Sequence, residues 1–317
     1  MFTPARRRII GRRLLQAVPV IVLSTFIVFG LLKLVPGDVA ITLAGDNASD
    51  QRIAEIRQIY GLDRPLLVQY GAWLLKAAHG DLSNSLISSE PVLTSIARCL
   101  PNTLLIVALA LVIALMIGIP LGIAAASRPG SWLDGSVMTI ASLGVAVPNF
   151  WLAMLLVAVL SLGFNLFPAT GSVPLLESPW ESLRHAILPA VALAAGGLAE
   201  VARQLRSSLV EVLESQQVRT LHAKGLSPSA ILWRHGLKNV SVNLLTVVSL
   251  LANRMLAATV VVEAVFAIPG MGGLIVNAAM HRDFPVVQGV VFVMVLIVVT
   301  INLLTDIFYS VLDPRIS

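Results

Sequence analysis

Charged and amide side chains stand inside the long apolar stretches of this chain, where such groups are rare and usually functional. Arg254 lies near the middle of one stretch, with Asn253 beside it and Glu263 about 13 Å further along, at about 1.5 Å of helix per residue. Asn302 and Asp306 have the i, i+4 spacing that puts both on one helix face. These groups can form an interhelical polar cluster, in which Arg254 pairs with Glu263 or Asp306. Alternatively they line a substrate path, where the guanidinium offers a fork of donors suited to a carboxylate.

No nucleotide-binding or common hydrolase motif occurs in the sequence. It contains no G-x-x-x-x-G-K-[ST], no H-E-x-x-H and no G-x-S-x-G, which excludes a P-loop of its own and the commonest protease and hydrolase signatures. The single cysteine, Cys99, excludes an intrachain disulfide framework and a cysteine-cluster metal site. The histidines are scattered and are interpreted as ordinary interfacial residues: His79, His185, His222, His235 and His281. We therefore expect a chain that is not an enzyme and that holds no cofactor and no metal of its own.

The composition is that of a membrane protein. Of the 317 residues, 57% are hydrophobic and 12% are charged, whereas soluble domains have about 45–50% apolar and about 25% charged residues. The net charge of +5 could indicate a nucleic-acid partner, but in a membrane protein the position of the basic residues matters more than their sum. The expected partner is the lipid bilayer, with no nucleic acid.

Six stretches are long and apolar enough to cross a bilayer, which takes roughly 20 residues of helix. The first follows an arginine-rich segment but is too long for a signal peptide and lacks an A-x-A-like site, so it is interpreted as a retained span. Pro120, Pro148 and Pro189 can free carbonyls whose compensation must come from neighbouring groups. The sequence predicts an all-α polytopic protein with six spans, at Leu14–Leu34, Asn102–Ser127, Gly135–Leu162, Ala186–Leu205, Val240–Phe266 and Val286–Leu312.

The distribution of Lys and Arg predicts the topology, because loops on the cytoplasmic side carry the excess of these residues. With the N-terminus inside, the inner side holds Arg6, Arg7, Arg8, Arg12, Arg13, Arg128, Arg203, Arg206, Arg219, Lys224, Arg234, Lys238 and Arg315. The outer side holds fewer: Arg52, Arg57, Arg64, Lys76, Arg184 and Arg282. We therefore expect a cytoplasmic N-terminus at 1–13 and a cytoplasmic tail at 313–317.

Two connections between spans are long enough to carry structure of their own. The segment 36–97 is expected outside, with short amphipathic helices at Asp50–Tyr60 and Pro65–Ala78. The inner segment 207–238 is too polar to be embedded in the membrane and too regularly patterned to be disordered. It is interpreted as a surface for a partner inside the cell.

Within the inner segment the pattern predicts a helix, a glycine turn and a second helix. Gly225 can take a positive φ and close a helix, and Ser227 with Pro228 suits the start of the next one. An amphipathic helix lying on the membrane surface is the alternative.

This segment resembles the cytoplasmic "EAA" loop of permease subunits of binding-protein-dependent ABC importers. The branch resembled is the dipeptide, oligopeptide and nickel group, in its first ("B") subunit. That group favours R-T-A-x-A-K-G-L, from which Leu221 departs by standing where a small alanine is usual. The residues that the resemblance assigns to contact with the ATPase are Arg219, Thr220, Leu221, Ala223, Lys224, Gly225 and Leu226.

The resemblance covers nearly the whole chain as an ordered series of motifs. They are Leu34–Asp38, Gly61–Tyr70, Gly80–Ser85, Val147–Leu152, Phe167–Gly171, Ile187–Ala190, Val262–Phe266, Pro269–Gly272, Arg282–Gly289 and Leu312–Ile316. Glu263 and Asp306 match positions that are commonly acidic in the family, where they are expected to brace the helices. Arg254 matches no usual family arginine.

The resemblance implies the fold and partners of a type I ABC importer permease. The expected organisation is a first span at 14–34, a periplasmic helical region at 36–97, and a five-span core at 98–312 with the coupling loop 207–238. The implied partners are a homologous second permease, two ATPase subunits that bind ATP and magnesium, and a periplasmic solute-binding protein. The implied location is the bacterial inner membrane.

The resemblance implies di- or oligopeptides as substrate, with nickel or another metal chelate as the alternative within the family. An ATP-independent channel or intramembrane enzyme is the alternative from a different class.

Overall fold

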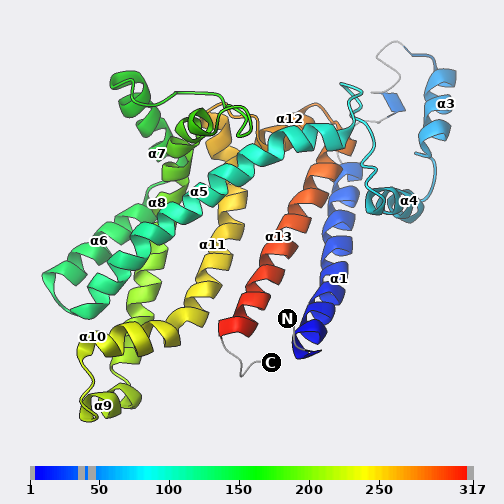
Figure 1. Ribbon diagram of the computed structural model, residues 1–317. Coiled ribbons are helices and arrows are strands. Elements are labelled where there is room, and N and C mark those ends of the chain that lie inside the picture. The colour runs from blue at the N-terminus through cyan, green and yellow to red at the C-terminus, as the bar shows by residue number, and fades with distance from the viewer. Residues whose placement is uncertain (1–3, 35–39, 42–47, 313–317) are drawn as a thin grey trace. The chain divides into compact units, whose positions relative to one another are not determined.

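The computed structural model describes residues 4–34, 40–41 and 48–312 (Figure 1). The predicted tail 313–317, most of the motif Leu34–Asp38 and the start of the 36–97 region lie outside the described residues. Within the described ranges the regular structure is helical, apart from one isolated bridge between Asn84 and Pro91. The all-α class expected from the sequence is confirmed.

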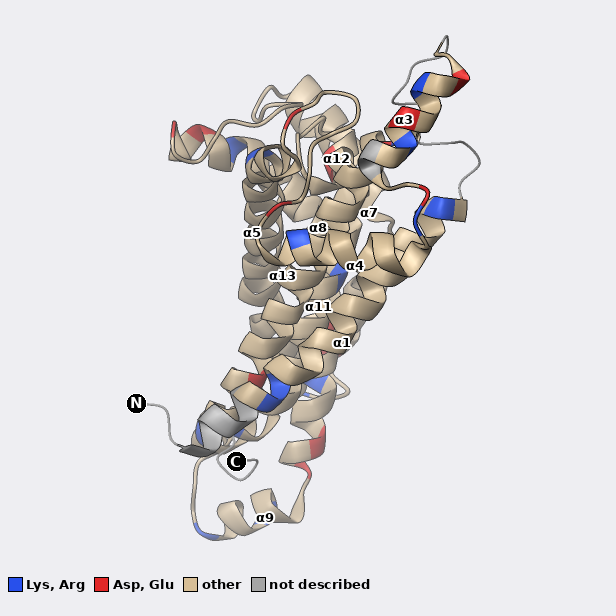
Figure 2. Cartoon of the chain, turned by 90° about the vertical axis from the view of Figure 1, so that its right-hand side faces the viewer, with Lys and Arg blue, Asp and Glu red and all other residues tan. Residues whose placement is uncertain are grey.

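Among the described residues, five continuous helical segments are long and apolar enough to span a membrane. The first is the part Gly11–Leu34 of α1 (Pro4–Leu34), and the fourth joins α10 (Pro228–Ala230), the π-helical η2 (Ile231–Gly236) and α11 (Leu237–Val265). The other three are α5 (Val92–Ser127), α8 (Pro179–Leu213) and α13 (Phe284–Leu312). Figure 2 shows long stretches of these helices without charged residues. Each predicted span except the third lies within one of them, to within a residue.

The third predicted span, Gly135–Leu162, is wrong as a continuous helix. It consists of α6 (Trp132–Ala146) and α7 (Asn149–Leu156), continued by the π-helical η1 (Val157–Gly163), with a bend of 94° between the two parts. Pro148 has no N–H to continue the first helix and disfavours helical geometry at the residue before it. Val147 is accordingly extended, with φ −79° and ψ 122°. The described chain has a sixth span only if these two bent parts are counted together as one broken span.

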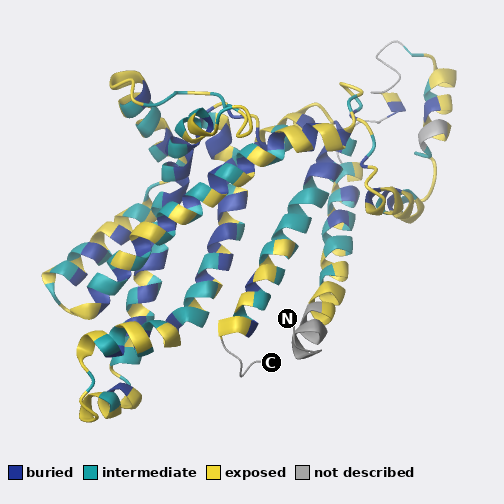
Figure 3. Ribbon diagram, viewed as in Figure 1, coloured by how far each residue is buried: buried dark blue, intermediate teal, exposed yellow. Residues whose placement is uncertain are grey.

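The chain divides into two compact units, of which the described part of the first is 4–11, 101–272 and 300–312. Here α8 packs against α6, α7 and α11, and it carries many of the buried residues in Figure 3. Alanine and glycine let the helices approach closely. A Cβ on Gly118 would lie 2.8 Å from the Leu198 carbonyl oxygen, and one on Gly122 equally near that of Ala202. Only glycine fits where α5 crosses α8.

The second unit contains Arg12–Leu100 and Gly273–Val299, described except for 35–39 and 42–47. The two predicted short helices are present as α3 (Asp50–Tyr60) and α4 (Leu66–Ala78), with Pro65 capping the second rather than lying in it. The Tyr70 hydroxyl joins α4 to α1 by donating to the Val22 carbonyl at 2.8 Å. Its ring packs edge-on against Phe29. The remaining short apolar helix is α12 (Met271–Met280).

Large apolar side chains are exposed along the spans, as bilayer-facing helices require. Leu15 on α1 is 74% exposed and Met116 on α5 is 72% exposed. Water would be an unfavourable neighbour for so much apolar surface, whereas lipid tails are as apolar as the side chains themselves.

Candidate functional site

The inner loop contains a helix that ends at a glycine, as the sequence predicts. Helix α9 (Gln216–Ala223) starts at the cap Ser215. At its end the Gly225 N–H donates to the His222 carbonyl at 2.9 Å, and the Leu226 N–H donates to the Leu221 carbonyl at 3.2 Å. This pair of bonds is the Schellman motif, which needs a left-handed residue. Gly225 supplies it with φ +82°.

The next helix, α10, starts at Pro228 and is capped by Ser227. The Ser227 hydroxyl accepts from the Ala230 N–H at 3.3 Å, and Pro228 occupies the first helical position. Val218 from α9 and Ile231 from η2 are buried, and η2 packs against α8 and α11. The predicted helix, glycine turn and second helix are confirmed.

The motif residues of this loop divide into an exposed set and a half-buried apolar set. Leu221 and Leu226 are half-buried. Trp233 on η2 is 61% exposed, which is unusual for so large an apolar side chain. The exposed set is Arg219, Thr220, Ala223, Lys224 and Gly225. The loop therefore presents cations and one large aromatic ring to its surroundings.

Arg254 is paired with Glu200 on α8, an acid that the sequence did not single out. The expected partners were Glu263 and Asp306. The pair lines a cavity of about 230 Å³ with Asn149, Arg203 and small residues of α8. The Arg254 side chain is 59% exposed, so it is available to a molecule entering this cavity.

The predicted contact between α11 and α13 is made by amides. The Asn253 Nδ2 donates to the Asn302 Oδ1 at 3.1 Å. The Oδ1 of Asn253 is buried and has no hydrogen-bond partner within the described chain. Asp306 lies one turn further along α13 and is half-buried. The polar groups of the two helices therefore lie together, whereas Arg254 faces α8.

Glu263 is completely buried and fixes the loop that follows α11. Its carboxylate accepts from the Thr103 hydroxyl at 2.5 Å and from the Gly272 N–H at 2.9 Å. The Thr103 oxygen in turn accepts from the Met271 N–H at 2.9 Å. A Cβ on Gly270 would lie 2.2 Å from the Glu263 carboxyl carbon. The motifs around Glu263 and Gly270 are therefore one structure: a glycine loop folded onto a buried carboxylate.

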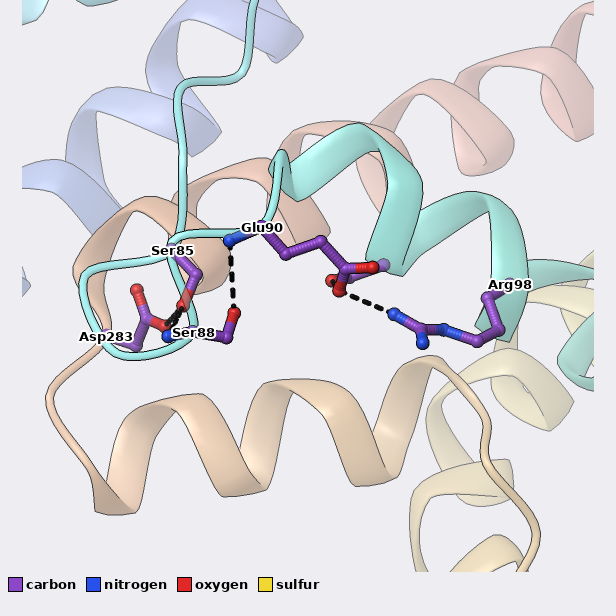
Figure 4. Close-up of polar contacts among 6 residues, drawn as sticks. Ser85, Ser88, Glu90, Arg98 and Asp283 are labelled. Carbon is purple, nitrogen blue, oxygen red and sulfur yellow. Dashed lines mark hydrogen bonds and ion pairs between the residues drawn. The ribbon is translucent and has the colours of Figure 1, made fainter.

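Asp283 joins two other motifs of the series (Figure 4). Its carboxylate accepts from the Ser85 hydroxyl and from the Leu86 N–H, the latter at 3.0 Å. Asp283 and Ser85 are both buried. The loop after α4 is thereby fastened to the segment just before α13.

Glu90, at the end of the same loop, is held by α5 (Figure 4). It accepts from the Ser95 hydroxyl at 2.6 Å and from the Arg98 guanidinium at 2.5 Å. The hydrogen bond from Ser95, with that from Arg98 and its positive charge, lowers the pKa of Glu90 from the usual 4.5.

A further ion pair, between Asp134 and Arg206, was missed by sequence reasoning. Arg206 on α8 donates to both carboxylate oxygens of Asp134 on α6, at 3.0 and 2.6 Å. Asp134 also accepts from the Gly130 N–H. One signal was available: Asp134 is the sole acidic residue between Glu90 and Glu177. The pair braces α8 immediately before the inner loop 207–238 begins.

The chain matches two family descriptions that together cover most of it. "Binding-protein-dependent transport system inner membrane component" matches residues 118–317, and the corresponding N-terminal membrane component matches residues 6–107. A putative peptide transport system permease protein of Brucella abortus (strain 2308) is 42% identical over 308 residues, covering 97% of this chain and 98% of that protein. The oligopeptide transport system permease protein AppB of Bacillus subtilis (strain 168) is 36% identical over 310 residues, covering 96% and 98%.

The fold is similar to that of a solved transporter. Inward-facing structures of the MetNI methionine ABC transporter match with a TM-score of 0.57 at 18% identity, over 71% of this chain and 99% of that chain. At this identity the likeness shows the fold alone.

Proposed function

The chain belongs to the family of binding-protein-dependent transport system inner membrane components, and we propose that it forms the peptide path of an ATP-driven importer together with a homologous second permease. The observation that carries this proposal is the 42% identity to a putative peptide permease along almost the entire length of both chains. Other relatives are named for dipeptide, oligopeptide and glutathione transport. Peptides of a few residues are the cargo common to these names.

Energy for transport comes from partner ATPase subunits, which bind ATP and magnesium. The inner loop 207–238 is the coupling element: its exposed face docks on the ATPase, and its buried residues connect it to α8 and α11. ATP favours one arrangement of the ATPase pair, and the loop passes that preference to the span bundle, which is a two-state equilibrium biased by a ligand. The Schellman turn at Gly225 supports this role, because it holds α9 at a fixed angle to the next helix.

The cavity beside Arg254 is part of the path through the membrane. A peptide has a terminal carboxylate, and a guanidinium offers paired donors that match it. Glu200 holds Arg254 when the cavity is empty and competes with the incoming carboxylate, so binding stays weak enough for release. A periplasmic solute-binding protein delivers the peptide, and both termini of the chain lie in the cytoplasm at the inner membrane.

The test is peptide uptake by the complete transporter in proteoliposomes, with its two permeases, ATPases and solute-binding protein. We expect accumulation of a labelled dipeptide or oligopeptide that requires ATP. Transport of the solute-binding protein's ligand without ATP would refute the proposal that the importer is ATP-driven. Uptake of a metal chelate in place of peptides would refute the proposal that peptides are the cargo.

Two matched variants test the path. Arg254→Gln should lower uptake roughly tenfold, the loss expected for a charge-assisted hydrogen bond, without changing assembly or basal ATPase activity. Glu200→Gln, which breaks the same ion pair but keeps the guanidinium, should retain uptake. If both variants fail equally to assemble, Arg254 is a structural residue and is not on the path.

A further inference from the structure

The second unit contains a cavity of about 460 Å³ that the transport cycle described above does not use. Its walls come from the end of α1, the turn between α3 and α4, one face of α4, the loop after α4 and the start of α13. This volume lies within the range of small-molecule sites, about 300–1,000 Å³.

Three cations line this cavity: Lys33, Arg64 and Lys76. No carboxylate is among the described side chains that form its walls. The turn that carries Arg64 is held in place by Gln69, whose side-chain amide donates to the carbonyls of Leu62 at 3.0 Å and Arg64 at 2.7 Å. Arg64 and Lys76 thus place positive charge around one space, which favours the binding of an anion.

Trp73 forms part of the wall of this cavity. Trp73 is only 8% exposed, and its ring is fixed by packing against Tyr70 and, edge-on, against Phe292. Its Nε1 atom is itself buried and does not face the cavity, so Trp73 contributes a fixed aromatic surface to the wall.

Several of the other lining residues are apolar. Leu32 directly precedes Lys33 and Phe29 lies one turn before it, both in the last turns of the first apolar span, and Phe284 and Pro285 begin the last span. The cavity therefore has cations at the level where a membrane helix ends and apolar side chains at the level where it begins. This order, from a cationic surface to an apolar one, matches the boundary between lipid head groups and acyl chains, where tryptophan and basic residues are also enriched.

We propose that this cavity is a binding site for an anionic phospholipid such as phosphatidylglycerol. The phosphate lies beside Arg64 and Lys76, and the start of an acyl chain lies along Phe29 and Leu32. Basic pockets between membrane helices bind lipid phosphates by the same chemistry. An inorganic phosphate would satisfy the charges but leave the apolar wall uncovered, and a protein partner would have to insert below the head-group level. A bound lipid would hold α1, α4 and α13 together in this unit.

Lipid titrations followed by native mass spectrometry test the proposal. The purified transporter complex is delipidated and titrated with dioleoyl-phosphatidylglycerol or dioleoyl-phosphatidylcholine. The double variant Arg64→Gln/Lys76→Gln should bind phosphatidylglycerol about 25-fold more weakly, at about fivefold for each basic residue near a membrane surface. Arg52→Gln removes a cation from α3 outside the cavity and should bind like the wild type.

Each outcome of these titrations either supports the lipid site or overturns it. Selective loss of phosphatidylglycerol in the double variant, with a complex that assembles and melts like the wild type, supports the site. Equal binding of the two lipids, or a double variant within twofold of the wild type, would overturn it. Displacement of the lipid by excess inorganic phosphate would also overturn it, in favour of a free-anion site. If the double variant binds lipid normally but binds the solute-binding protein poorly, the surface belongs to that protein.

Discussion

Replacing Thr103 with valine should destabilise the chain sharply, although the two side chains have nearly the same shape. The hydroxyl of Thr103 donates to Glu263 and accepts from the N–H of Met271, and Thr103 itself is fully buried. Valine can do neither. The substitution therefore removes two hydrogen bonds at once and leaves a buried N–H without an acceptor.

The size of the effect follows from these contacts. Hydrogen bonds between membrane helices are worth about 0.6 kcal/mol each on average and at most about 1.7 kcal/mol, so two give roughly 1–3 kcal/mol. A buried donor left unpaired costs about 1–3 kcal/mol more. The expected destabilisation by Thr103→Val is roughly 2–6 kcal/mol. Thr103→Ser keeps the hydroxyl and loses one buried methyl group, for about 1 kcal/mol.

The measurement is thermal unfolding of the purified transporter in detergent, at one scan rate for all variants because such unfolding is usually irreversible. For chains of this size, 1 kcal/mol corresponds to about 2–4 °C in melting temperature. Thr103→Val should therefore melt roughly 4–24 °C below the wild type, and Thr103→Ser only a few degrees below it. If valine and serine give the same melting temperature, the hydroxyl does not support Glu263, and the account of the glycine loop fails.

The other predictions concern the inner loop, the topology and the outer loop. Gly225→Asn should retain most uptake because asparagine tolerates a positive φ, whereas Gly225→Ala should strain the turn by about 1–2 kcal/mol and lower uptake; equal uptake in the two variants would refute the Schellman turn. In a Cys99→Ser background, a cysteine placed at the exposed position Ser88 should react with a membrane-impermeant maleimide on intact spheroplasts. Labelling only after lysis would show that the topology is the reverse of the predicted one. Because the folded-state pKa of Glu90 is lowered, its pairing should stabilise the outer loop fully above pH 4.5 and lose this effect as pH falls through the lowered value. Glu90→Gln should flatten that acid limb of the melting temperature, and an unchanged limb would show that the contact with Arg98 adds nothing.

Features that depend on local chemistry follow from the amino-acid sequence alone. Apolar runs defined the spans, because every backbone group in a bilayer must be bonded within its own helix. Gly225 and Ser227 marked the end of one helix and the start of the next, since capping uses residues within one or two turns. The ordered motifs identified the family without any structural information.

Which distant groups meet depends instead on how the helices pack. Arg254 has acidic residues on several helices within plausible reach, and helix rotation rather than spacing paired it with Glu200 on α8. The bend at Pro148 is a second feature that spacing along the sequence does not determine. Pro120 and Pro189 lie inside continuous helices, whereas Pro148 stands at a 94° break. A proline removes one hydrogen bond wherever it occurs, but whether the helix continues depends on the neighbours that pack around it.

The same reason applies to two buried carboxylates, Glu263 and Asp283, whose partners the sequence does not identify. Glu263 and Asp283 each bond groups from segments more than a hundred residues away, Thr103 and Ser85 respectively. A buried carboxylate must find donors, but the sequence does not say which loop supplies them. The fold brings α5 to the first and the loop after α4 to the second, and only that packing turns separate motifs into bonded pairs.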